Sequence, residues 1–160
     1  MRPNMSRAFI AGFAGTIFIT LMMYFVSPMM SGGPMDIAAM LGGLLGGSWV
    51  AGIVAHFVIG TVVFPVIYSL FLFPVLTGSP AVRGMTWGLI LWFVSQAVVM
   101  PVLGGGFFSS QAGGLMAVMD SLIGHLVYGF VFGVVAGGAH AARIRETEDL
   151  GSEAHVRRAG

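Results

Sequence analysis

Long runs of apolar residues fill most of the chain, and short polar or glycine-rich segments separate them. A helix needs about 20 consecutive apolar residues to cross the hydrocarbon core of a bilayer. Four runs reach that length, at residues 8–30, 48–73, 84–103 and 115–138. A single span must be helical, because only a helix satisfies its own backbone hydrogen bonds in lipid. The pattern therefore predicts an all-α integral membrane protein, built as a four-transmembrane-helix bundle.

The segments outside these runs predict the ends and connections of the bundle. Residues 1–7 form a short polar start, and residues 139–160 form a polar tail that we expect to be disordered. All seven basic residues are arginines, and they precede the first run, follow the second or follow the fourth. By the positive-inside rule, both termini then face the cytoplasm. Pro34 and Asp36 predict the start of a short helix over residues 35–45, lying at the membrane surface.

The composition excludes several classes of protein. Only 8% of the residues are charged, 57% are hydrophobic and the mean hydropathy is +0.94, whereas about 25% of the residues of a soluble domain are charged. The absence of cysteine excludes disulfides, thiolate metal sites and thiol catalysis. No cluster of basic and aromatic residues predicts nucleic-acid binding. No catalytic or nucleotide-binding motif occurs, which favours a protein that is not an enzyme.

The second half of the apolar region repeats features of the first half. Glycines and prolines of the first run match those of the third, and a histidine followed by a glycine occurs in both the second and the fourth. The matched pairs are Gly15 with Gly88, Pro28 with Pro101, His56 with His125 and Gly60 with Gly129. This internal repeat predicts two tandem helical hairpins in one orientation, related by an axis along the membrane normal.

Two histidines, His56 and His125, lie within predicted spans. An ionisable residue inside a span usually faces the bundle interior and is a functional hypothesis by default. Residues three and four positions away share its helix face, and several of these are small or polar. They are Gly52 and Gly60 beside His56, and Ser121, Tyr128 and Gly129 beside His125. Because small residues let a helix or a flat ligand approach closely, the two histidines and these neighbours form the candidate site.

Three interpretations of the histidine pair stay open. The spacing fits a b-type haem with His56 and His125 as axial ligands. It also fits a metal ion held by both imidazoles, and the twelve methionines direct attention to copper, because thioethers favour Cu(I). In the third interpretation each histidine is neutral, and a neighbouring hydroxyl, amide or carbonyl group satisfies it. The candidate side-chain partners are Thr61, Ser95, Gln96, Ser121 and Tyr128.

Two acids and three prolines interrupt the apolar part of the chain. Asp36 and Asp120 lie near predicted helix starts, where the helix dipole favours a negative charge. The alternative role is an entry site for a proton or a cation. Asp120 lies five residues before His125, so we expect it on a different helix face. The prolines that we expect to stop or kink the spans are Pro28, Pro65 and Pro101.

Several segments resemble a family of small, four-span bacterial inner-membrane proteins of unknown function. They are AGFAGT (11–16), PMDIAAM (34–40), AHFVIGT (55–61), VVMPV (98–102) and HLVYG (125–129). The resemblance covers roughly residues 8–138. It implies a multi-pass protein of the bacterial inner membrane and lends no activity. It also places both histidines in the shared pattern, which favours a site over simple packing.

Three functions follow from these observations. The sequence most favours a non-enzymatic accessory or interaction protein, whose apolar faces contact the lipid bilayer and other membrane-protein subunits or a second copy of the chain. The second function is a membrane protein that binds b-type haem. The third is a carrier or channel for copper or another small solute.

Overall fold

The computed structural model describes residues 4–33 and 35–159, and it describes their side chains except those of Ser31 and residues 138–159. Within this part every regular element is a helix. Four helical stretches are long and apolar enough to cross a membrane, and we call them spans 1 to 4. They are Met5–Met30, Trp49–Leu72, Pro80–Val102 and Gly114–Gly137. These stretches correspond to the four predicted runs, so the all-α, four-span fold is confirmed.

Each of the first three spans is a series of consecutive helical segments. Span 1 contains α1 (Met5–Leu21), η1 (Met22–Val26) and α2 (Ser27–Ser31). Span 2 contains α4 (Trp49–Val58), η2 (Ile59–Val63), α5 (Phe64–Ile67) and η3 (Tyr68–Leu72). Span 3 contains α6 (Pro80–Val94), η4 (Ser95–Val99) and α7 (Met100–Val102). Between the spans lie α3 (Ile37–Leu44) and the short turn η5 (Phe107–Ser109), and α8 (Gly114–Ala159) contains span 4.

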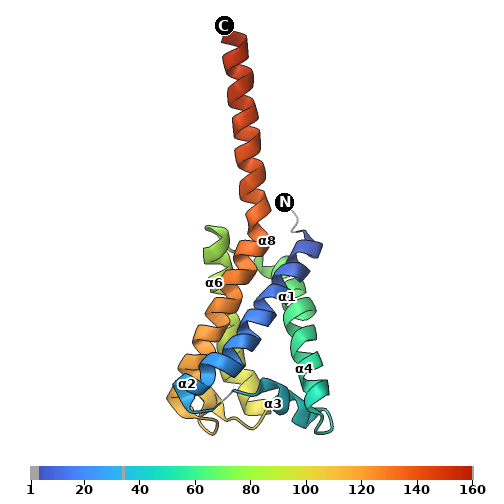
Figure 1. Ribbon diagram of the computed structural model, residues 1–160, viewed down its shortest axis with the longest axis vertical. Helices are drawn as coiled ribbons and strands as arrows, with labels where there is room; N and C mark the ends of the chain where they lie inside the picture. Colours follow the sequence, from blue (N-terminus) through green and yellow to red (C-terminus); the bar gives the residue numbers. More distant parts are fainter. Residues whose placement is uncertain (1–3, 34, 160) are drawn as a thin grey trace.

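The start of α1 and the far end of α8 lie at the same end of the bundle, which we call the terminal end (Figure 1). Figure 1 also shows α3 at the opposite end, which we call the loop end. Two arginines anchor the terminal end by donating to backbone carbonyls. Arg7 Nη2 lies 3.3 Å from the oxygen of Val135, and Arg83 Nε lies 3.0 Å from the oxygen of Gly78. The assignment of this end to the cytoplasm stays a prediction.

Parts of the predicted polar start and of the polar tail are helical in the structure. α1 begins at Met5, and the side chain of Asn4 caps it by accepting a hydrogen bond from the backbone of Arg7. Residues 1–3 lie outside the described part of the chain. The backbone of α8 continues to Ala159, and the predicted disorder of residues 139–160 concerns positions whose side chains are not described.

Four segments with wide, π-helical turns share one feature, which is a proline two residues after the segment ends. The segments η1, η2, η3 and η4 precede Pro28, Pro65, Pro74 and Pro101. Proline has no N–H, and its ring clashes with the carbonyl four residues earlier in an α-helix. In each segment the residue before the proline donates its N–H to the carbonyl five residues earlier. The wider turn makes room for the ring, so spans 1, 2 and 3 continue beyond Pro28, Pro65 and Pro101, whereas span 2 ends before Pro74.

Span 3 packs against span 4 with almost no side chains between the two backbones. A Cβ atom added at Gly84 would overlap the carbonyl oxygen of Gly129, and one added at Gly88 would overlap that of His125. Small residues at such positions are typical of close helix packing in membranes. Gly129, which the sequence places in the candidate site, therefore serves the contact between α6 and α8.

The tandem repeat is not confirmed by the packing of its matched glycines. A Cβ at Gly88 would lie 3.2 Å from Cα of Gly129 in the second hairpin. In the first hairpin a Cβ at the matching Gly15 would meet the ring of Tyr128 at 2.8 Å, and Gly60 packs against Thr16 instead. Matched residues thus have different partners, and two tandem hairpins stay a prediction.

Aromatic side chains fill the bundle between its centre and the terminal end. The rings of Tyr68 and Phe132 lie 4.9 Å apart, and Phe64 makes an edge contact with Trp87 at 6.0 Å. Trp87, Tyr68, Tyr128 and Phe132 are all buried. These contacts join spans 2, 3 and 4, so the terminal half of the bundle is densely packed.

At the loop end α3 packs directly on α4. A Cβ added at Gly52 would overlap the carbonyl oxygen of Ala38, and one added at Gly42 would lie 2.9 Å from the carbonyl carbon of Ser48. Figure 1 shows α3 lying between α2 and α4. The short helix predicted over residues 35–45 is present, and it separates α4 from span 1 at this end. Its position at the membrane surface stays a prediction.

Candidate functional site

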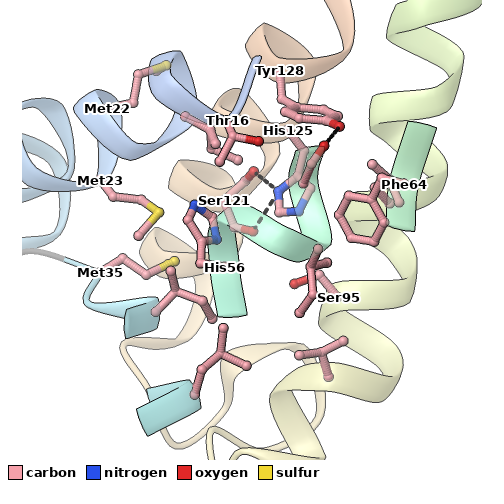
Figure 2. A pocket seen from close by; sticks show the side chains of 18 of the residues that line it. Thr16, Met22, Met23, Met35, His56, Phe64, Ser95, Ser121, His125 and Tyr128 are labelled. Carbon is pink, nitrogen blue, oxygen red and sulfur yellow. Dashed lines mark hydrogen bonds between the residues drawn. The ribbon is translucent and has the colours of Figure 1, made fainter. Parts of the chain in front are cut away.

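A cavity of about 220 Å³ lies at the centre of the loop half of the bundle. All four spans and α3 contribute to its wall, which is mostly apolar. Figure 2 shows part of this wall, with side chains from several helices directed into one space. The polar side chains that line it are Thr16, His56, Ser95, Asp120, Ser121, His125 and Tyr128. The cavity is therefore an apolar space with a small set of polar groups, which is typical of ligand pockets.

Most of the site residues predicted from the sequence line this cavity. They are His56, Gly60, Ser121, His125 and Tyr128. The structure brings the two histidines together, because both line the same cavity from α4 and α8 (Figure 2). Gly52 and Gly129 are instead occupied by helix packing, against α3 and α6 respectively.

The hydrogen bond of His125 determines which ring nitrogen carries the proton. Nδ1 lies 2.8 Å from the carbonyl oxygen of Ser121 and 3.4 Å from its hydroxyl. A carbonyl oxygen only accepts, so Nδ1 carries the hydrogen and Nε2 carries the lone pair. This Nε2 has no partner among the described residues. Ser121, one of several partners predicted for the two histidines, thus pairs with His125 mainly through its backbone carbonyl.

His56 has the opposite tautomer. Its Nε2 lies 3.1 Å from Oγ1 of Thr20, and the hydroxyl of Thr20 donates to the carbonyl of Thr16 at 2.6 Å. Because the single hydroxyl hydrogen is used, Nε2 of His56 must donate to Thr20. Its Nδ1 then carries a lone pair, and no described residue pairs with it. Sequence reasoning missed Thr20, although Thr16 and Thr20 share one face of α1 at helical spacing.

Asp120 differs from its prediction in its position along the helix, and it joins His125 at the cavity. α8 begins at Gly114, so Asp120 lies inside the helix and not in its first turn. Its side chain is buried, accepts a hydrogen bond from the hydroxyl of Ser27 and lines the cavity together with His125. Residues five apart differ in direction around a helix, and both side chains nevertheless reach the cavity because it is wide. Gly124, which also lines it, has no side chain to divide the two groups.

Asp36 has the predicted role at a helix start. Its side chain caps α3 by accepting from the backbone of Ala39 at 2.9 Å. It also accepts from the hydroxyl of Tyr24 at 3.0 Å and from the indole of Trp49 at 3.2 Å. One carboxylate therefore joins α3 to the loop ends of spans 1 and 2.

Sulfur atoms also line the cavity. Figure 2 shows Met23 and Met35 with their sulfur atoms on the side of the cavity where the ring of His56 lies. Met22 and Met100 complete the set of thioethers in the wall. Among the described residues, no three histidine or acidic side chains gather as metal ligands. A metal site in this part of the chain would therefore depend on thioether ligands.

Residues 2–147 match a family model described as a family of unknown function, DUF6789, which covers nearly the whole chain. No curated protein matches the chain significantly, and no solved structure does. The family match carries no assigned activity, so the function has to be argued from the cavity.

Proposed function

The chain belongs to DUF6789, a family of unknown function, and we propose that it binds a small ligand in its central cavity, as a carrier or receptor within the membrane. The supporting observation is that His56 and His125 line one cavity, and each has a ring nitrogen without a partner among the described residues. An unpaired polar group in an apolar environment is unfavourable by about 1–3 kcal/mol. A ligand that donates to these nitrogens would remove that cost.

The accessory-protein hypothesis has less support than ligand binding. Large apolar side chains are exposed on all four spans, for example Phe25, Phe71, Val98 and Leu115. Lipid alone requires such a surface, so it indicates no particular partner. A specific internal cavity is not needed by a protein that acts only through its outer faces.

The hydrogen bond of His125 favours the haem hypothesis, whereas that of His56 does not. His125 donates from Nδ1 to a carbonyl, which is the arrangement that orients Nε2 towards a metal. His56 uses its Nε2 in the bond to Thr20, so axial ligation through that atom would require the bond to break. An absorption spectrum of the protein, expressed with ample haem, tests this directly. A Soret band that is lost in both His56→Ala and His125→Ala would establish haem.

Copper is a second candidate, carried by the thioethers beside His56. Met23 of η1, Met35 of the segment before α3 and His56 of α4 line one cavity. Thioether and imidazole groups are suitable ligands for Cu(I). Metal analysis of protein purified after growth with copper, compared with the double variant M23L/M35L, tests this candidate. Equal metal content in the two proteins would rule out this site.

The proposed function is tested by asking whether a small molecule co-purifies with the protein. Native mass spectrometry and solvent extraction of detergent-purified protein should reveal a small molecule bound to the wild type. The variant Ser95→Phe, which places a ring in the cavity wall, should lose it. Val54→Ala changes an exposed residue of α4 near His56 and should retain it. An empty wild type, together with a Ser95→Phe variant that is only more stable, would show that the cavity is a packing defect.

A further inference from the structure

The cavity is lined by the buried carboxylate of Asp120 and by two imidazoles that each present a lone pair, and from this we infer that its ligand is a small lipophilic amine in its protonated form. The inference rests on the proposed function and adds the chemical class of the ligand. The ammonium group would lie against Asp120 and accept no hydrogen bonds, and the apolar part would fill the space between the spans.

Several hydroxyl groups around the cavity donate their hydrogens within the protein. Thr16 donates to the carbonyl of Gly12 at 2.7 Å, and Tyr128 donates to that of Gly60 at 2.8 Å. Ser27 donates to Asp120 in the same way. The imidazoles of His56 and His125 contribute lone pairs, as their tautomers require. Among the described side chains, the lining hydroxyls that remain as donors are those of Ser95 and Ser121, so acceptor atoms outnumber donors in the cavity. An ammonium group carries donors alone and matches this excess of acceptors.

The carboxylate of Asp120 provides the negative charge that such a ligand needs. It exposes only 6% of its surface, and its partner among the described residues is the neutral hydroxyl of Ser27. Arg7 and Arg83, the arginines with described side chains, bond to carbonyls at the terminal end. By contrast, Asp36 is held by three donor groups at the loop end. A charge within a membrane span is normally paired, and a cationic ligand would pair Asp120.

The apolar wall and the volume limit the rest of the ligand. A cavity of about 150 Å³ lined by apolar side chains binds benzene, so a volume of about 220 Å³ admits one ring with a short chain. Phe64 and Tyr128 present aromatic rings in the wall, and Ile19, Ile59 and Leu91 present aliphatic groups. An aromatic ring with an aminoethyl chain fits both limits.

The test uses three probes of similar size on the detergent-purified wild type. They are 2-phenylethylamine, which is a cation near neutral pH, the neutral 2-phenylethanol and the anion phenylacetate. Isothermal titration calorimetry should show saturable binding of the amine, binding of the alcohol weaker by about tenfold or more, and no binding of the anion. This series needs no variant, so it stays decisive even where a substitution disturbs folding.

Two variants then test whether the carboxylate of Asp120 provides the negative charge that binds the amine. Asp120→Asn should weaken amine binding by about 30-fold or more, because it removes one partner of a buried charge pair. Asp36→Asn is the matched control, since it neutralises an acid that does not line the cavity, and it should bind the amine as the wild type does. Circular dichroism and size-exclusion profiles confirm that both variants are folded.

The outcomes separate this inference from the proposed function. Equal affinity for the amine and the alcohol, with no effect of Asp120→Asn, overturns the amine and leaves a ligand-binding cavity standing. Absence of saturable amine binding to the wild type also overturns the inference. The co-purification experiment then decides separately whether the proposed function survives.

Discussion

The hydroxyl of Tyr128 donates a hydrogen bond of 2.8 Å to the carbonyl of Gly60, and Pro65 is the reason that this carbonyl is available. In an α-helix the acceptor would pair with the N–H four residues later. Here the N–H of Phe64 bonds to Ile59, and Pro65, one residue further on, has no N–H. The proline in span 2 thus creates an acceptor that a side chain from span 4 satisfies.

This relationship predicts a coupled effect of two substitutions. Tyr128→Phe should lower the free energy of unfolding by about 1–3 kcal/mol, because it leaves a buried carbonyl unpaired. Pro65→Ala supplies an N–H that can take the place of the phenol. In that background Tyr128→Phe should therefore have a smaller effect. Unfolding of the four proteins in mixed detergent micelles measures the coupling, and strictly additive effects would contradict the explanation.

The contact between α6 and α8 predicts that alanine has very different effects on stability at two glycine positions. Gly84→Ala should reduce the free energy of unfolding by about 1–3 kcal/mol, because the new Cβ would overlap the backbone of Gly129. Gly43→Ala is the control, since no atom lies within 4 Å of its added Cβ. That substitution should be neutral or stabilising by up to about 1 kcal/mol. Similar thermal midpoints for the two variants would argue against close backbone packing.

The two histidines should be distinguishable by nuclear magnetic resonance. With histidine labelled by ¹⁵N, His125 is expected as the tautomer protonated at Nδ1 and His56 as the one protonated at Nε2, because of their different partners. Thr20→Val should change the signals of His56 and leave those of His125 in place. Val62→Ala, on the exposed face of span 2, should change neither pattern. Two histidines in the same tautomer would remove the basis of the acceptor-rich cavity.

Asp36 should contribute to stability through geometry more than through charge. Asp36→Ala removes the cap of α3 and the acceptor for Tyr24 and Trp49, so we expect a loss of about 1–3 kcal/mol. Asp36→Asn keeps one oxygen acceptor and should lose less than half as much. Thermal unfolding of the purified proteins measures both effects. Equal losses would show that the charge is what matters.

The four spans could be predicted because they follow from length and hydropathy alone. The two histidines could be selected because an ionisable residue in a span is rare, and the structure places both at one cavity. Other members of the site depend on how the helices face one another. Thr20 lies on span 1, and nothing along the chain relates it to His56 until α1 and α4 are packed.

The glycines illustrate a limit of reasoning from spacing. Gly52, Gly60 and Gly129 all occur four residues from a histidine, so the sequence treats them alike. The structure separates them, because only Gly60 lines the cavity, whereas the other two lie against neighbouring backbones. A small residue permits close approach, and the partner that approaches is decided by tertiary packing. The place of Asp120 in the cavity wall was missed for a related reason, since helical periodicity does not give the width of a cavity.

The contact of Gly52 with Ala38 has a consequence for the shape of the ligand space. The backbones of α3 and α4 touch at Gly52, so a displacement of α3 would move α4 and His56 on it. A helix of eight residues that does not itself cross the bilayer thus sets how far apart the walls of the cavity stand.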